Sequence, residues 1–134
     1  MAKKCEHDRQ SCAVCSPEKV WKQYAYKAKQ RNLTFSLTLQ EFETLVNDSC
    51  HYCGQWPSNG IDRVDNGIGY VNGQVKNCVP ACKDCNFAKV VMTKENFIRM
   101  CVRVAEHQKK IAEEKKKAKL EQAGGPPPQA AVCA

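Results

Sequence analysis

Two Cys-x-x-Cys pairs, CHYC at 50–53 and CKDC at 82–85, constrain this chain more than any other feature of its sequence. Each pair places two thiolates on one tight turn, and Zn²⁺ prefers a tetrahedral set of four such ligands. A single pair would also fit a redox site, whereas two pairs at this spacing indicate a metal site. We therefore predict a structural zinc on Cys50, Cys53, Cys82 and Cys85; the alternative is four ordinary buried cysteines.

A second cysteine cluster lies near the start of the chain, in the run CEHDRQSCAVC. It reads Cys-x-His-x4-Cys-x2-Cys, which gives a second candidate zinc set of Cys5, His7, Cys12 and Cys15. The alternative is a flexible N-terminal segment with a few unliganded thiols. Three further cysteines, Cys78, Cys101 and Cys133, have no assigned role.

The cysteine content indicates a reducing compartment rather than a disulfide framework. The chain has ten Cys among 134 residues, and Met1-Ala-Lys-Lys leads into the first cluster without the apolar core of a secretory signal. Zinc binding in a reducing interior is therefore favoured over disulfides. No apolar stretch has the length of a transmembrane helix, so we expect a cytoplasmic protein of a bacterial or phage-infected cell, with no membrane partner.

The formal net charge is +7. An excess of Lys and Arg on a small chain suits a polyanionic partner, and nucleic acid is the commonest one. A solvated lysine-rich surface would give the same composition, so charge alone does not decide between these readings.

Helix signals surround the central stretch. Ser16 is an expected N-cap ahead of Pro17 at the first helical position. Thr38 and Glu41 form an expected capping box for a helix over about 39–47. Thr93 is the expected cap of a final helix, which becomes a lysine- and glutamate-rich extension from about Gln108.

The sequence between the two cysteine pairs favours a hairpin. Residues 61–64 and 75–79 are predicted to pair as antiparallel strands joined by a long loop, and Pro80 is expected to end the second. A short helix is expected around 85–88. The predicted fold class is α+β, a small zinc-stapled core flanked by helices. The expected parts are an N-terminal zinc segment (1–16), a central domain (17–107) and a charged extension with a disordered tail (108–134).

The expected order of elements is strand, hairpin, strand and helix, bracketed by a four-cysteine site. This layout resembles the ββα-metal, treble-clef-like core of the HNH endonuclease family. Asp62 matches the Asp of that family's first motif, Asn77 its central Asn, and Asn86, just after Cys85, its last His or Asn. The resemblance covers roughly residues 21–106. It implies a phosphodiester hydrolase that acts on DNA.

The resemblance also implies a second kind of metal. Asp62 and the side-chain carbonyl of Asn86 would bind one catalytic Mg²⁺ or Mn²⁺, distinct from the closed four-thiolate zinc. Asn77 would stabilise the active-site loop through side-chain to backbone hydrogen bonds.

The sequence departs from the family at Arg63, where most members have the His that serves as general base. Arginine stays protonated, so it cannot take a proton, but it can bind phosphate and stabilise transition-state charge. Some members of the family also have Arg here, and in that variety a Tyr near the first cysteine pair can stand in as the base. The resemblance therefore implies Tyr52 as a candidate base, and His51, whose ordinary pKa is closer to neutrality, is the other candidate. Alternatively, Asp62 and Arg63 form a surface pair that braces the hairpin.

Several readings stay open at this level. The lysines near the second cysteine pair either touch phosphate or are simply solvated: Lys83, Lys89 and Lys94. The chain is a nuclease, a zinc-stapled nucleic-acid-binding module that has lost cleavage, or a protein-interaction module. A homodimer is one way for a single small site to cut both strands of DNA.

Overall fold

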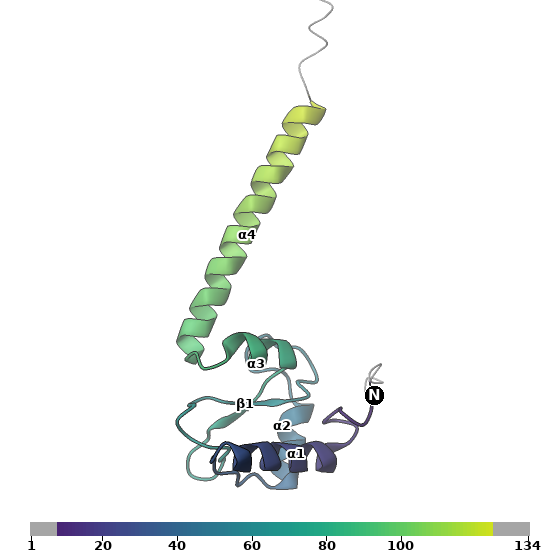
Figure 1. The fold of residues 1–134 in the computed structure, drawn as a ribbon. Coiled ribbons are helices and arrows are strands. Elements are labelled where there is room, and N and C mark those ends of the chain that lie inside the picture. The colour runs from purple at the N-terminus through teal and green to yellow at the C-terminus, as the bar shows by residue number, and fades with distance from the viewer. Residues whose placement is uncertain (1–7, 125–134) are drawn as a thin grey trace, which may run out of the picture. The chain divides into compact units, whose positions relative to one another are not determined.

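A computed structural model describes residues 8–124, so the predictions for Cys5, His7 and Cys133 lie outside the described part of the chain. Its elements, in chain order, are α1 (Pro17–Gln30), α2 (Leu39–Asn47), β1 (Ile61–Arg63), β2 (Cys78–Pro80), α3 (Lys83–Lys89) and α4 (Lys94–Ala123) (Figure 1). The predicted α+β class, with a two-stranded hairpin, a four-cysteine cluster and flanking helices, is confirmed.

The two strands form an antiparallel hairpin in which Asp62 pairs with Val79 and Arg63 pairs with Cys78. The second strand is shorter than predicted because it begins at Cys78 rather than near residue 75, and it ends at Pro80, which is its last residue. Asn77 lies outside this strand because its side chain and backbone amide bond to the connecting loop. Proline is tolerated here because a two-stranded sheet has only edge strands, where the missing N–H is not required.

The hydrophobic core lies where α1 and α2 pack together and α2 contacts the hairpin. Figure 1 shows the hairpin between these two helices on one side and α3 on the other. Phe42 and Val46 of α2 are completely buried, and the rings of Tyr24 and Phe42 lie 5.4 Å apart. This packing fixes the hairpin that carries Asp62, the predicted ligand of a catalytic ion.

The predicted starts of α1 and α2 are correct, although α1 lacks the expected side-chain cap. Thr38 Oγ1 accepts from the Glu41 amide at 3.1 Å, and the Glu41 carboxylate accepts from the Thr38 amide at 2.9 Å, so the capping box is confirmed. Ser16 does not cap α1 with its side chain, because its hydroxyl donates to the Arg9 carbonyl instead. Pro17 still suits the first helical position, because its ring fixes φ near the helical value.

Two glycines allow the chain to turn tightly around the cysteine pairs. Gly54 follows the first pair with φ +77°, a conformation that favours glycine. At Gly60, a Cβ would lie 2.7 Å from the Ala81 carbonyl oxygen, so any side chain would force the two backbones apart. The close approach of residues 60 and 81 brings the segments of the two pairs together.

The residues up to Phe97 and those from Ile98 form two compact units. The second unit contains most of α4, whose described side chains are almost all exposed. None of the helices in the described range is both long and apolar enough to cross a membrane.

Candidate active site and metal centre

The four cysteines predicted to bind zinc converge. The Sγ atoms of Cys50, Cys53, Cys82 and Cys85 all lie within 4.8 Å of one another. The Cys53 and Cys82 sulfurs are 3.7 Å apart, close to the roughly 3.8 Å that a tetrahedral site with Zn–S bonds of about 2.3 Å requires. The cluster is therefore consistent with a structural zinc.

Backbone amides orient these thiols. Cys82 precedes α3, and its sulfur accepts from the Cys85 amide at 3.4 Å, while the Cys50 sulfur accepts from the Cys82 amide at 3.3 Å. Burial raises the pKa of the Cys50 thiol, but hydrogen bonds, mainly from backbone amides, outweigh this effect and lower the pKa to about 7. Amides that stabilise the charge of the Cys50 thiolate prepare this ligand for a cation, whereas burial raises the pKa of Cys82 and Cys85.

The N-terminal cluster is only half described. Cys12 is 1% exposed, and the side-chain oxygen of Asn59 accepts from its thiol at 3.4 Å and from the Val14 amide at 3.1 Å. Cys15 is exposed. Because Cys5 and His7 lie outside the described residues, the second zinc stays a prediction. Asn59, which the sequence did not single out, links this segment to the central domain.

Asp62 is buried, with 6% of its surface exposed, and it has two close partners. The Tyr52 hydroxyl donates to Asp62 Oδ2 at 2.6 Å, and the Lys89 ammonium lies 3.1 Å from the same oxygen. The alternative of a surface pair between Asp62 and Arg63 is wrong, since both residues are buried and the ion-pair partner of Asp62 is Lys89.

Asn86 and Asn77, the two asparagines that match family positions, bind backbone groups that precede and follow Asp62 in the sequence. Asn86 is on α3, and its side-chain amide donates to the Ile61 carbonyl at 3.1 Å, next to Asp62 on β1. Asn77 is 2% exposed and bonds through its side chain to the backbone of Asp65 and Gly69. Asn77 thus makes the loop contacts that its expected role requires, and its part in catalysis stays a prediction.

The two candidate bases differ in their surroundings. Burial, and then the hydrogen bond to Asp62, raise the pKa of Tyr52. Burial, and then the nearby Lys94 ammonium, lower the pKa of His51, against a smaller opposite effect of Asp62. Nε2 of His51 lies 2.9 Å from the Lys94 Nζ, and the two rings, His51 and Tyr52, have centroids 5.3 Å apart.

Arg63 points into the loop that Asn77 stabilises. Its Nη1 donates to the carbonyls of Asn66 and Ile68 at 2.8 and 3.0 Å, and its guanidinium lies 5.3 Å from the centre of the Tyr70 ring. These contacts order the connection between the strands. The predicted phosphate contact of Arg63 stays a prediction.

Lys89 is the residue that sequence reasoning missed. The sequence predicts it to be one of three lysines that touch phosphate or are solvated, yet its surface is 0% exposed. A signal was available: Lys89 follows Asn86 by three residues, so on a helix both side chains lie on one face. The predicted helix around 85–88 stopped one residue too early for that relation to be seen.

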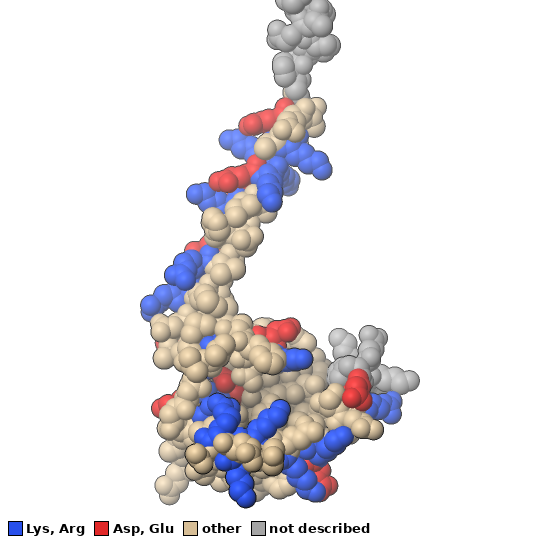
Figure 2. Space-filling model, viewed as in Figure 1, with Lys and Arg blue, Asp and Glu red and all other residues tan. Residues whose placement is uncertain are grey.

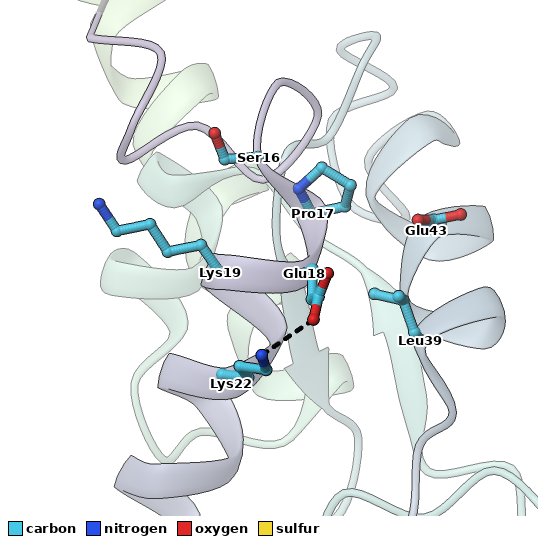
Figure 3. A pocket seen from close by; sticks show the side chains of 7 residues that line it. All are labelled: Ser16, Pro17, Glu18, Lys19, Lys22, Leu39 and Glu43. Atoms are coloured by element: carbon cyan, nitrogen blue, oxygen red, sulfur yellow. Dashed lines mark ion pairs between the residues drawn. The ribbon is translucent and has the colours of Figure 1, made fainter.

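A surface hollow lies at the start of α1, away from these residues. Figure 3 shows it lined by Ser16, Pro17, Glu18, Lys19, Lys22, Leu39 and Glu43. Glu18 and Lys22 form an exposed ion pair there at 2.8 Å. Its lining includes none of the residues predicted for the site.

Lys and Arg side chains gather over α1 (Figure 2).

Comparison with known proteins supports the fold assignment. No protein-family model matches the sequence. A segment of 89 residues, 64% of this chain, is 43% identical to the uncharacterized protein R423 of Acanthamoeba polyphaga mimivirus, but it spans only 16% of that protein. The structure is similar to that of the rare-cutting HNH restriction endonuclease PacI, with a TM-score of 0.53 and 19% identity over 81% of this chain and 87% of PacI. That likeness shows a shared fold.

Proposed function

We propose that this chain is a metal-dependent endonuclease of the HNH type that hydrolyses phosphodiester bonds in DNA. The observation that supports this proposal best is the meeting of β1 and α3. There the Asn86 amide bonds to residue 61 while the next residue, Asp62, presents a buried carboxylate. The fold shared with the HNH restriction endonuclease PacI and the net charge of +7 agree with it.

The donor set at this position suits a hard divalent ion such as Mg²⁺ or Mn²⁺. The described residues give Asp62 Oδ1 no hydrogen-bond partner, and Asn86 uses only its amide nitrogen, so two oxygens remain available. Oxygen ligands are those that these ions prefer. When bound, the ion would supply positive charge at the scissile phosphate. The four-thiolate site differs, because its closed shell has no open position for substrate.

His51 is the better candidate for general base. Its lowered pKa favours the neutral imidazole near neutral pH, which can accept a proton from water. Its Nε2 is paired with Lys94, so we infer that an incoming phosphate draws the ammonium away and frees this nitrogen. The Tyr52 hydroxyl already donates a hydrogen bond to Asp62, which suits it to orienting the carboxylate.

Arg63 and Asn77 support the reaction by ordering the loop between the strands. Both are buried, and their side chains bind loop carbonyls from residues 65–69. The guanidinium also places a permanent positive charge near the site. A duplex partner would bind partly through exposed lysines such as those of α1, and a homodimer would let two such sites cut both strands.

Plasmid cleavage by the purified, zinc-loaded protein tests the proposal. We expect cleavage with Mg²⁺ or Mn²⁺, none with EDTA, and a loss of at least about 100-fold in Asp62→Ala. Asp48→Ala is the matched control, because Asp48 is an exposed carboxylate at the end of α2. Equal loss in both variants, or cleavage that persists in EDTA, would overturn the proposal.

A second function has one specific observation in its favour. Arg63 stands where the family's usual base is found, and its guanidinium faces loop carbonyls. A zinc-stapled DNA-binding module without cleavage is therefore the runner-up. Salt-dependent binding of DNA, with no cleavage under any divalent ion, would favour it.

A further inference from the structure

Lys89 is a fully buried ammonium group at the last position of α3. Its Nζ lies 3.1 Å from Asp62 Oδ2 and donates to the Arg63 carbonyl at 3.5 Å. The burial of an ammonium group away from water costs much free energy unless the charge is paired. The other ion pair within residues 8–124, Lys22 with Glu18, is exposed. The buried pair lies at the proposed active site, because its carboxylate is that of Asp62.

The partners of Asp62 are unevenly distributed between its two oxygens. Oδ2 receives both the Tyr52 hydroxyl and the Lys89 ammonium, while the described residues place no donor on Oδ1. Asn86 precedes Lys89 by three residues on α3, so the same helix face delivers both side chains to β1. The carboxylate is thus fixed through one oxygen, and the other remains available.

We propose that Lys89 is a positioning residue: a built-in counter-charge that fixes the Asp62 carboxylate and weakens the binding of a divalent ion until nucleic acid is present. A fixed positive charge on Oδ2 repels a cation at Oδ1, and the repulsion is strong because little water separates the groups. A bound phosphate adds negative charge and offsets this repulsion. The divalent ion is then bound tightly only together with DNA.

This inference rests on the proposed function, because it requires the divalent ion of the proposed site. Mn²⁺ binding without nucleic acid tests the metal site and the role of Lys89 together. Free Mn²⁺ is measured by electron paramagnetic resonance with the zinc-loaded wild type and Lys89→Met. We expect Lys89→Met to bind Mn²⁺ at least about tenfold more tightly, since one charge is removed from the site. Lys83→Met, at an exposed lysine of the same helix, should leave the dissociation constant within about twofold.

The outcomes separate the two proposals. If the wild type binds Mn²⁺ and Lys89→Met binds it equally or more weakly, the role of Lys89 is overturned and the metal site stands. If neither protein binds Mn²⁺ even with DNA present, the proposed metal site fails, and this inference fails with it.

A double-mutant cycle covers the case in which Lys89→Met does not fold. Asp62→Asn, Lys89→Met and the double variant are compared by thermal unfolding in zinc-loaded protein without Mn²⁺. Each single variant leaves one buried charge unpaired, whereas the double variant leaves none. We expect the melting temperature of the double variant to lie closer to wild type than that of either single variant. Additive losses would show that Lys89 does not compensate Asp62.

Discussion

The Tyr52 hydroxyl donates a hydrogen bond of 2.6 Å to Oδ2 of Asp62, and this contact distinguishes Tyr52 from His51, the other candidate for the base. The Tyr52 hydroxyl keeps its proton and donates it in a hydrogen bond to a carboxylate, because burial and then this bond raise the pKa of Tyr52. The pKa of the neighbouring His51 is lowered instead. The contact therefore favours Tyr52 as a group that orients Asp62 and His51 as the group that activates water.

Substituting the two residues should have unequal effects on cleavage. Tyr52→Phe keeps the ring and its packing against Phe97 but removes the bond to Asp62, so we expect a loss of about tenfold or less. His51→Ala removes the proposed base, and general-base catalysis is typically worth about 100- to 10,000-fold. Single-turnover cleavage rates at saturating Mg²⁺ measure both. The reverse order of losses would identify Tyr52 as the base.

Lys94 should set the pH at which cleavage declines. Burial and then Lys94 lower the pKa of His51 below its ordinary value of 6.5, so the neutral base persists as the pH falls through that value. Lys94→Met removes one of these causes, the pKa rises, and the acid limb of the rate profile moves to higher pH. Cleavage rates between about pH 5 and 8 locate the limb. An unchanged limb in Lys94→Met would contradict this account.

Zinc content should test both cysteine clusters. We expect two zinc ions per chain, released in a colorimetric chelator assay after denaturation. Cys12→Ser should reduce the count to one, and Cys50→Ser should remove the other ion and unfold the central domain. Cys101→Ser is the control, because Cys101 is exposed on α4. A wild-type count of one that Cys12→Ser leaves unchanged would show that the N-terminal cluster does not bind zinc.

Stability should depend on the aromatic core beneath the hairpin. Phe42 is 0% exposed, and truncation of a buried phenylalanine costs about 3–5 kcal/mol of unfolding free energy. Phe42→Ala should therefore destabilise the zinc-loaded protein by an amount in this range. Tyr26 is 65% exposed, and Tyr26→Ala should change stability by less than about 0.5 kcal/mol. Urea unfolding followed by circular dichroism measures both, and equal losses would contradict the assigned core.

Local sequence signals were sufficient for much of this fold. The capping box of Thr38 and Glu41 and the proline at residue 17 placed two helix starts correctly, because both depend on chemistry within one turn. The paired Cys-x-x-Cys motifs correctly predicted the four-cysteine cluster, because two thiols on each of two tight turns are the pattern that suits zinc.

The electrostatics of the candidate site were less accessible from sequence. Whether Lys89 is solvated or buried depends on how α3 packs on β1, and the 27 positions that separate Asp62 from Lys89 give no local sign of it. Likewise, only the folded loop reveals that Arg63 faces carbonyl groups. The burial of Lys89 and the partners of Arg63 depend on contacts of the folded chain, which the individual motifs do not predict.

Asn77 should keep the loop between the two strands ordered. This loop carries the carbonyl groups that Arg63 binds. Its side chain accepts from the Asp65 amide at 2.8 Å and donates to the Asp65, Ile68 and Gly69 carbonyls. Asn77→Ala would leave several of these groups unpaired at about 1–3 kcal/mol each where they are buried.

We therefore expect Asn77→Ala to increase hydrogen exchange of the Asp65 amide and to lower cleavage by at least about tenfold, with zinc still bound. Asn72 in the same loop is the matched control, since its buried Oδ1 has no hydrogen-bond partner among the described residues. Asn72→Ala should leave exchange and cleavage nearly unchanged. Normal exchange at Asp65 in Asn77→Ala would show that the loop is ordered by Arg63 and the strand pairing alone.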